Sequence, residues 1–352
     1  MKYFIWVLLI LLIVFRFLST RPLYKNGDTI RLTTIVYSDP VVYGNYQTFN
    51  AFGLKVSLPL FPEVYYGDRV VLEGIVGDGK LRNAKLISLD NFTGFGSGIR
   101  KKLIDFYQQT LPQPMAGLVA GITLGSKRSL TSDFWQKVKN TGVAHVVVAS
   151  GTNVTFVVSF IFGITAMYLP RKKSILIVIL SIILYLFISG FDAPLIRAAV
   201  MAILAFWAQS TGRLLSAWRS LLLAAGMMLV IEPDWITDLG FTLSFVSTAS
   251  IMIFEKRIAR LLKFMPSGLK QGLSTSLSAQ IGVAPILFVS FGKFNILSPL
   301  INALVLWTIP YIMIFGALGG VLGIFMPILG RVVLYICYPL TWWFIEIVSL
   351  FS

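Results

Sequence analysis

A cluster of polar side chains interrupts a long apolar stretch in the middle of the chain. Residues 142–157 are apolar enough to enter a membrane, yet the stretch holds polar and small residues. These are His145, Ser150, Gly151, Asn153 and Thr155. In hydrocarbon each polar group needs a partner, and irregular backbone persists only where it is buried in protein or lines a cavity. The cluster therefore predicts a helix that is broken at Ser150-Gly151, with Asn153 facing a cavity.

These polar residues allow three interpretations. They could gate a pathway through the membrane, or they could only hydrogen-bond neighbouring helices to one another. In the third interpretation the chain is an intramembrane hydrolase, in which His145 activates Ser150 as a nucleophile and an acid orients the histidine. We favour the pathway and predict that the chain is not an enzyme.

A second cluster joins an acidic residue to an arginine at the start of another apolar segment. Asp192 is typical of a helix N-cap, and Pro194 is typical of the first helical turn. Arg197 lies one turn inside the segment, where a charge is costly. We expect Arg197 to face the protein interior. There it would either pair with Asp192 or meet an anionic substrate, and a position at the membrane interface is the alternative.

Two further clusters lie downstream. Gly240 and Ser244, which follow Asp238, are spaced for close packing between helices. Between 285 and 302, polar residues indicate either another broken helix or a tight external turn. They are Lys293, Asn295 and Asn302. We count these three, with Asp238 and Ser244, among the candidates for a pathway or gate.

The composition is that of a membrane protein. Hydrophobic residues make up 56% of the chain and charged residues 13%, whereas soluble proteins carry roughly 25% charged residues. One cysteine and one histidine predict no disulfide, no metal site and no cofactor. The net charge of +15 fits cytoplasmic loops rich in Lys and Arg, a polyanionic partner, or both.

Apolar segments long enough to cross a bilayer recur after the first polar cluster. We predict spans near 143–169, 174–190, 194–211, 217–231, 239–254, 272–290, 297–323 and 327–350. Basic loops alternate with acidic ones: 171–173 and 256–270 carry Lys and Arg, whereas Asp192 and the 232–238 segment are acidic. By the positive-inside rule the basic loops are cytoplasmic, in a multi-pass protein of the cytoplasmic membrane.

The N-terminal part divides differently. Residues 1–21 predict an uncleaved anchor helix, and 22–91 predict an external β-barrel because apolar and polar residues alternate between turn signals. Residues 92–141 predict amphipathic helices at the membrane interface and a short apolar segment that could be re-entrant. Residues 142–352 complete a polytopic α-helical membrane protein with a small extracytoplasmic all-β domain.

The predicted barrel resembles an OB-fold, because Gly67-Asp68 precedes its longest apolar strand. That fold often binds nucleic acid by stacking bases on aromatic side chains over a basic groove. The side chains available for such binding are Tyr37, Tyr43, Tyr46, Tyr65, Tyr66 and Arg69. Most single aromatic residues in such a domain serve as barrel core or rim, so each remains a candidate.

The ordered set of motifs is similar to the ComEC family, the channel for single-stranded DNA in natural competence. The shared features follow the predicted anchor and OB-like domain in the family's order. They are Leu111-Pro112, the segment 121–125, Gly142 with His145 and Ser150-Gly151, Arg197-Ala198, the segment 240–245, and the segment 291–302. The resemblance implies a single-stranded DNA channel without a catalytic centre. Its expected partners are DNA, the bilayer, an external DNA receptor, a separate nuclease and a cytoplasmic motor.

Two departures from the family pattern qualify this resemblance. Many members have a second histidine after the Ser-Gly pair, where this chain has Asn153. Larger members end in a metallo-β-lactamase-like domain, whereas this sequence has no histidine-rich metal motif, so we expect nuclease activity to come from another protein. A small-solute or lipid transporter with broken helices remains the main rival function. The sequence leaves the oligomeric state open.

Overall fold

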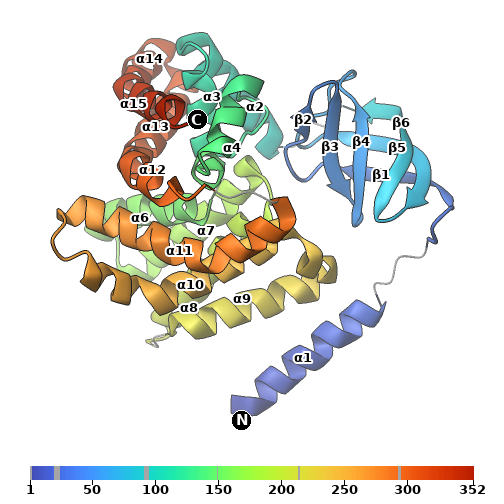
Figure 1. The fold of residues 1–352 in the computed structure, drawn as a ribbon, viewed down its shortest axis with the longest axis horizontal. Helices are drawn as coiled ribbons and strands as arrows, with labels where there is room; N and C mark the ends of the chain where they lie inside the picture. The colour runs from blue at the N-terminus through green and yellow to red at the C-terminus, as the bar shows by residue number, and fades with distance from the viewer. Residues whose placement is uncertain (1, 20–23, 91–94, 149, 213–214, 292–294) are drawn as a thin grey trace.

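The computed structural model describes residues 2–19, 24–90, 95–148, 150–212, 215–291 and 295–352. The described chain is mostly helical and has one six-stranded sheet near its N-terminal end. Figure 1 shows this sheet beside the helices, which form two groups, one with α2–α4 and α12–α15 and one with α6–α11. The sequence expectation of a helical protein with a small all-β domain is confirmed at this level.

The β-domain is built from strands that alternate buried and exposed residues. The strands are β1 (Thr29–Ile35), β2 (Val41–Tyr43), β3 (Tyr46–Ala51), β4 (Leu54–Pro59), β5 (Arg69–Gly77) and β6 (Lys80–Asp90). Their order is β1-β5-β6-β4-β3-β2, and β4–β6 is a parallel pair whereas the other neighbours are antiparallel. In β4, Leu54, Val56 and Leu58 are buried as their alternation predicts. Phe52, which the same alternation would bury, instead lies exposed in the preceding turn with a positive φ of 49°.

Helix α1 (Lys2–Ser19) stands apart from the sheet in Figure 1 and lies along α9 (Ala217–Ile231). The Arg16 guanidinium donates a hydrogen bond to the carbonyl of Val230 at 3.0 Å. A side-chain atom of Leu9 lies 2.3 Å from where a Cβ on Gly226 would stand, so α1 approaches α9 closely at that glycine. These two contacts hold α1 beside α9.

The first helical core surrounds α3 (Met115–Leu124), in which every residue is buried. The segment that the sequence left as a short re-entrant candidate is thus an enclosed central helix. Around it pack α2 (Phe95–Thr110), α4 (Ser132–Asn140), α12 (Ser298–Val305), α13 (Ile309–Phe325), α14 (Pro327–Tyr335) and α15 (Cys337–Leu350). The apolar face of α2 packs into this core through Leu103 and Tyr107, and its expected position at the membrane interface stays a prediction.

The second helical group holds the polar clusters that the sequence singled out. It contains α6 (Gly151–Tyr168), α7 (Arg171–Ser189), α8 (Ala193–Ser210), α9, α10 (Leu239–Leu261) and α11 (Ser267–Phe291). The short helix α5 (Ala144–Val147) precedes α6 and packs on the first core through Val146 and Val147. Short 3₁₀ helices, η1 (Pro233–Thr237) and η2 (Leu306–Thr308), connect α9 to α10 and α12 to α13. A core of Val154, Val178, Ile182 and Leu195 joins α6, α7 and α8.

The described residues contain five helices that are long and apolar enough to cross a membrane, or six if the bent pair α14–α15 counts as one span. The sequence predicted eight spans in the same region. One difference is α9, which has only 15 residues, fewer than the roughly 20 that a bilayer requires. Another is α10, whose C-terminal third carries Glu255 to Arg260 and is strongly charged. By length and composition these two helices are the weakest of the predicted spans.

Candidate functional site

The helix that begins after Gly142 is broken where the sequence predicted. Helix α5 ends at Val147 and α6 begins at Gly151, and the described flanking residues Val148 and Ser150 have extended backbone. Residue 149 lies outside the described residues. The N–H groups at the start of α6 carry the positive end of the helix dipole. The break therefore exposes a helix N-terminus inside an apolar segment.

Asn153 turns toward the protein core rather than toward a cavity. Its side chain is fully buried, and its amide nitrogen donates a 2.7 Å hydrogen bond to the carbonyl of Ile122 on α3. The Ser150 hydroxyl donates to the side-chain oxygen Oδ1 of Asn153 at 3.3 Å. The cavity expected at Asn153 is thus replaced by a closed contact, and this side chain plays the helix–helix bonding role that the sequence left as an alternative.

The remaining residues of the cluster point away from this contact. His145 and Thr155 are exposed, and the Thr155 hydroxyl donates back to the carbonyl of Gly151. The Ser150 hydroxyl shares a 2.5 Å hydrogen bond with Thr152 and has no hydrogen bond to His145 among the described contacts. The contact that a Ser150–His145 hydrolase would require is therefore not made in this arrangement.

Arg197 lies partly buried beside the broken helix. Its Nε donates to the Ser244 hydroxyl at 2.7 Å, and its guanidinium stands 5.8 Å from the centre of the Phe245 ring. A Cβ on Gly151 would come within 2.8 Å of Arg197 Nη2, so only glycine allows the guanidinium so close to the start of α6. The described ion pairs include none with Arg197. The site thus brings together a cation and a helix N-terminus without an acidic counter-ion.

Asp192 is not the partner of Arg197. It occupies the N-cap position of α8, as predicted, but its side chain makes no capping hydrogen bond. Instead Asp192 Oδ2 lies 3.5 Å from Lys127 Nζ. The expected Asp192–Arg197 pair is therefore corrected to a Lys127–Asp192 pair, because Arg197 turns toward α10 and α6.

Asp238 and Ser244 serve different purposes on α10. The Asp238 side chain caps the helix by accepting a 2.7 Å hydrogen bond from the Phe241 N–H. Ser244 bonds Arg197 rather than mediating the close packing predicted from its spacing to Gly240. The close contact of α10 is with α11, where Ser250 lies within 3 Å of the Cβ position of Gly282.

The downstream polar cluster, residues 295–302, is hydrogen-bonded to the turn that follows α4. The Asn295 amide donates a 2.9 Å hydrogen bond to the carbonyl of Asn140, and the Ser298 hydroxyl donates to the carbonyl of Gly142 at 3.3 Å. Helix α11 ends at Phe291 and α12 begins at Ser298, so the helical path is interrupted here too. Asn302 is buried, and its side-chain oxygen has no hydrogen-bond partner. Lys293 lies outside the described residues.

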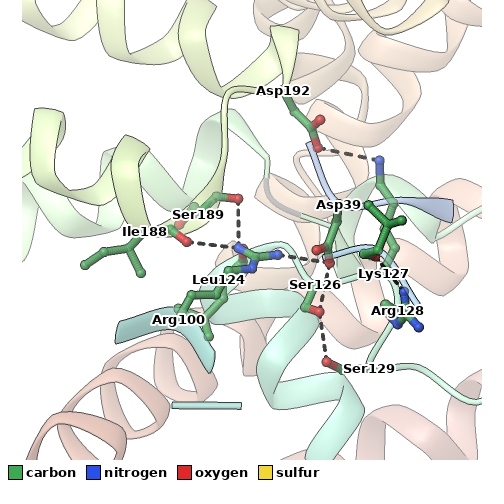
Figure 2. Close-up of polar contacts among 11 residues, drawn as sticks. Asp39, Arg100, Leu124, Ser126, Lys127, Arg128, Ser129, Ile188, Ser189 and Asp192 are labelled. Atoms are coloured by element: carbon green, nitrogen blue, oxygen red, sulfur yellow. Dashed lines mark hydrogen bonds and ion pairs between the residues drawn. The ribbon is translucent and has the colours of Figure 1, made fainter. Parts of the chain in front are cut away.

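A second polar junction, which the sequence did not predict, joins the β-domain to the helices (Figure 2). Arg100 of α2 is 4% exposed. Its Nη2 lies 3.0 Å from Asp39 Oδ2 in the loop between β1 and β2. Its Nη1 donates to three carbonyls, those of Leu124, Ile188 and Ser189. This guanidinium therefore contacts one carboxylate and the carbonyl ends of two helices.

The loop after α3 completes the junction. The Ser126 hydroxyl donates to Asp39 at 2.9 Å and shares a hydrogen bond with Ser129. Arg128 forms a 2.8 Å ion pair with Glu63 and donates to the carbonyl of Val64. Both acidic residues belong to the β-domain and both arginines to the helical part. The two parts are thus joined by buried and half-buried ion pairs of complementary sign.

The aromatic candidates of the β-domain separate into two groups. Tyr65 lies against the Arg128 guanidinium, 4.4 Å from ring centre to carbon, and Tyr66 faces Arg100 and donates to the carbonyl of Phe187. These two tyrosines belong to the junction. Tyr37, Tyr46 and Arg69 are exposed. The side chain of Tyr43 lies outside the described residues.

Sequence reasoning missed Arg100 and Asp39, although one signal was available. Arg100, Leu103 and Tyr107 follow each other at helical spacing, so they share the face that is buried. Nothing local marked Asp39 as the partner. Among the described residues, no three His, Cys, Asp or Glu side chains are grouped so that they could hold a metal ion.

Comparison with known proteins adds to this geometry. The family described as "Competence protein" matches residues 122–352. ComE operon protein 3 of Bacillus subtilis (strain 168) is 27% identical over 239 residues, covering 66% of this chain and 30% of that protein. Competence protein ComA of Neisseria gonorrhoeae is 27% identical over 145 residues, or 39% of this chain and 21% of that protein.

The chain therefore spans less than a third of the length of these curated relatives. No solved structure gives a significant match. The family match covers more than half of the chain and includes the broken helix, Arg197, the α10 cluster and the α11–α12 interruption. This chain belongs to the Competence protein family.

Proposed function

We propose that this chain acts in DNA uptake as the channel through which single-stranded DNA crosses the cytoplasmic membrane. Its membership of the Competence protein family supports a role in uptake. The observation that carries the channel proposal is Arg197. Its guanidinium lies beside the N-terminus of α6 and has no carboxylate partner among the described ion pairs. Such a cation suits a phosphate that passes by.

The placement of Arg197 fits a transient contact better than a tight binding site. The guanidinium is held from one side by Ser244 and rests near the Phe245 ring, so its orientation is fixed before an anion arrives. The Thr152 hydroxyl at the start of α6 is exposed and adds a further polar group. A DNA strand must be released as well as bound, and one cation with hydroxyl groups attracts phosphate without trapping it.

We propose that the β-domain is an OB-fold that guides the strand to the membrane. Two features of its topology support this. The sheet has one parallel pair, β4–β6, and its two edge strands β1 and β2 follow each other directly in the chain. A curled sheet would bring these edges together, as in a five-stranded barrel whose first strand is bent. Exposed Tyr37, Tyr46 and Arg69 are the side chains that would stack on bases and contact phosphate.

The charges at the helix ends support an external position for the β-domain. One end of α7 carries Arg171, Lys172 and Lys173, and its other end contributes the carbonyls of Ile188 and Ser189 to the junction with the β-domain. Basic residues thus lie at the end remote from the β-domain. By the positive-inside rule that end is cytoplasmic and the β-domain is extracytoplasmic.

The channel proposal can be tested with the full chain in liposomes. We expect a fluorescent single-stranded oligonucleotide, driven by an imposed membrane potential, to enter proteoliposomes that contain the protein and to become protected from added nuclease. Entry should be independent of base sequence, and binding before entry should weaken as salt increases.

A matched pair of variants gives the control. Arg197→Gln should reduce entry, whereas Arg171→Gln, which also removes one charge, should leave it unchanged because Arg171 is an exposed residue at the far end of α7. Equal entry into liposomes with wild-type and Arg197→Gln protein would remove the basis of the proposal. Entry of small anions but not of oligonucleotides would favour a small-solute transporter instead.

A further inference from the structure

The end of α10, the turn that follows it and the start of α11 carry a cluster of positive charge, here called the basic tip. It consists of Lys256, Arg257, Arg260, Lys263 and Lys270. No Asp or Glu occurs between Glu255 and Glu346. Glu255 itself accepts a 2.6 Å hydrogen bond from Thr275. The described ion pairs include none with a residue of the basic tip.

Large apolar side chains stand exposed among these cations. Leu261 is 76% exposed and Phe264 79% exposed. Single exposed apolar residues are common on proteins, but these two lie between Arg260 and the start of α11, and Lys263 separates them. Helix α11 is itself long and apolar enough to cross a membrane. Cations and apolar residues that alternate next to a span are typical of a segment at the headgroup level of a bilayer.

The base of the tip is rigid. The Ser250 hydroxyl donates a 2.6 Å hydrogen bond to the carbonyl of Ser278, and Gly282 allows α10 and α11 to pack closely there. The two helices therefore present the tip as one unit. A rigid helix pair loses little conformational entropy when its end binds a surface.

We propose that the basic tip binds the headgroups of anionic phospholipids, with Leu261 and Phe264 inserted at the boundary of the acyl chains. Charge complementarity and the exposed apolar residues both point to lipid. Nucleic acid would neutralise the cations but would leave Leu261 exposed to water. An anionic lipid surface would both neutralise the cations and cover the apolar side chains. This inference does not depend on the proposed channel, because it concerns the far end of α10 from the Arg197–Ser244 contact.

The test uses the full chain in a neutral detergent. Phosphatidylglycerol or phosphatidylcholine is titrated in, and bound lipid is counted by native mass spectrometry. The triple variant Arg257→Gln/Arg260→Gln/Lys263→Gln should lose affinity for phosphatidylglycerol on the order of 100-fold, because each cation near an anionic surface contributes about fivefold. Affinity for phosphatidylcholine should stay as in the wild type.

Two further variants make the result specific. The control Lys55→Gln/Lys80→Gln/Lys85→Gln removes three exposed charges from the β-domain and should keep its affinity for phosphatidylglycerol. Leu261→Ser/Phe264→Ser should weaken phosphatidylglycerol binding and leave oligonucleotide binding unchanged. Unchanged phosphatidylglycerol binding in the first triple variant would overturn the inference. Loss of oligonucleotide binding in that variant, with phosphatidylglycerol binding kept, would assign the basic tip to nucleic acid and overturn it as well.

Discussion

Two arginines lie inside the helical part of this protein, and their surroundings are opposite. Arg100 meets a carboxylate and three carbonyls, at a junction of the β-domain with α3 and α7. Arg197 meets one hydroxyl, a methionine sulfur 3.5 Å away and an aromatic ring, but no carboxylate among the described ion pairs. The first charge is paired with a carboxylate of the protein, whereas the second has no carboxylate partner among the described ion pairs.

Two residues of the same type can therefore have different roles, one in stability and one in the proposed function. A buried charge is tolerated when it is paired and hydrogen-bonded. Removing one member of such a pair leaves the other buried and unpaired, which destabilises the protein. A cation without a counter-ion is costly to keep, so a protein that retains one gains little stability from it. Burial of an arginine alone is thus a poor guide to its role. The partners of its guanidinium are a better guide.

The largest effect should come from Arg100. Arg100→Ala leaves Asp39 and several helix-end carbonyls buried without their donor, so we expect the free energy of unfolding to fall by about 3–5 kcal/mol. Thermal or denaturant unfolding in detergent measures this. Lys102→Ala on the same helix is the control and should have little effect, because Lys102 is exposed.

The double variant Asp39→Asn/Arg100→Gln sharpens that result. Removing both charges should recover part of the lost stability, because no buried charge remains unpaired. If Arg100→Ala and Lys102→Ala had the same free energy of unfolding, the Asp39–Arg100 pair would contribute no stability, and the contrast with Arg197 would fail.

The next largest effect should come from Arg197, and on transport rather than on stability. A charged hydrogen bond to phosphate contributes about 1.5–3 kcal/mol, so Arg197→Gln should lower oligonucleotide entry into liposomes roughly ten- to a hundredfold. The free energy of unfolding should change by less than about 1 kcal/mol, because the lost bond to Ser244 is offset by relief of a desolvated charge. Arg197→Lys keeps the charge and should retain part of the entry. A large loss of stability with normal entry per folded molecule would make Arg197 structural, like Arg100.

Asp192 should have a small effect, in contrast to both arginines. Asp192 and Lys127 are each about a quarter exposed, at 27% and 26%, and such pairs typically contribute 1 kcal/mol or less, about the size of a surface pair. Asp192→Asn should therefore leave oligonucleotide entry unchanged and shift the unfolding midpoint only slightly. If it reduced entry as Arg197→Gln does, the two residues would act together despite the absence of a direct contact.

The smallest effect concerns Asp68, a buried carboxylate of the β-domain. Burial raises the pKa of Asp68, although its Oδ2 accepts a 2.7 Å hydrogen bond from the Tyr65 N–H and cations lie nearby. A carboxyl group with a raised pKa contributes stability below its ordinary pKa, and this contribution is lost as the pH rises through the raised value. The stability of the wild type relative to Asp68→Asn should therefore fall as the pH rises above the ordinary carboxyl pKa of 3.8. Unfolding curves at several pH values measure the difference, and a difference that stays constant would contradict it.

Several local features could be predicted from the sequence because they depend on neighbouring residues. Polar side chains next to Ser150-Gly151 interrupt an apolar segment, and the helix is indeed broken there. Alternating burial in β4 and β5 follows directly from their residue pattern. Asp192 and Asp238 precede helices at the N-cap positions that their residue types favour. These features are set within one turn of helix or a few strand residues.

The roles of the buried polar groups were decided only by the tertiary structure. Arg197 finds Ser244, 47 residues away, rather than the nearby Asp192, and Ser126 finds Asp39, 87 residues away. Asn153 closes onto the end of α3 instead of lining a cavity. A sequence pattern shows that a polar side chain at such depth must find a partner. Which partner it finds depends on how helices and strands distant in the chain pack together, and that packing gives Arg100 a carboxylate partner and Arg197 a hydroxyl partner.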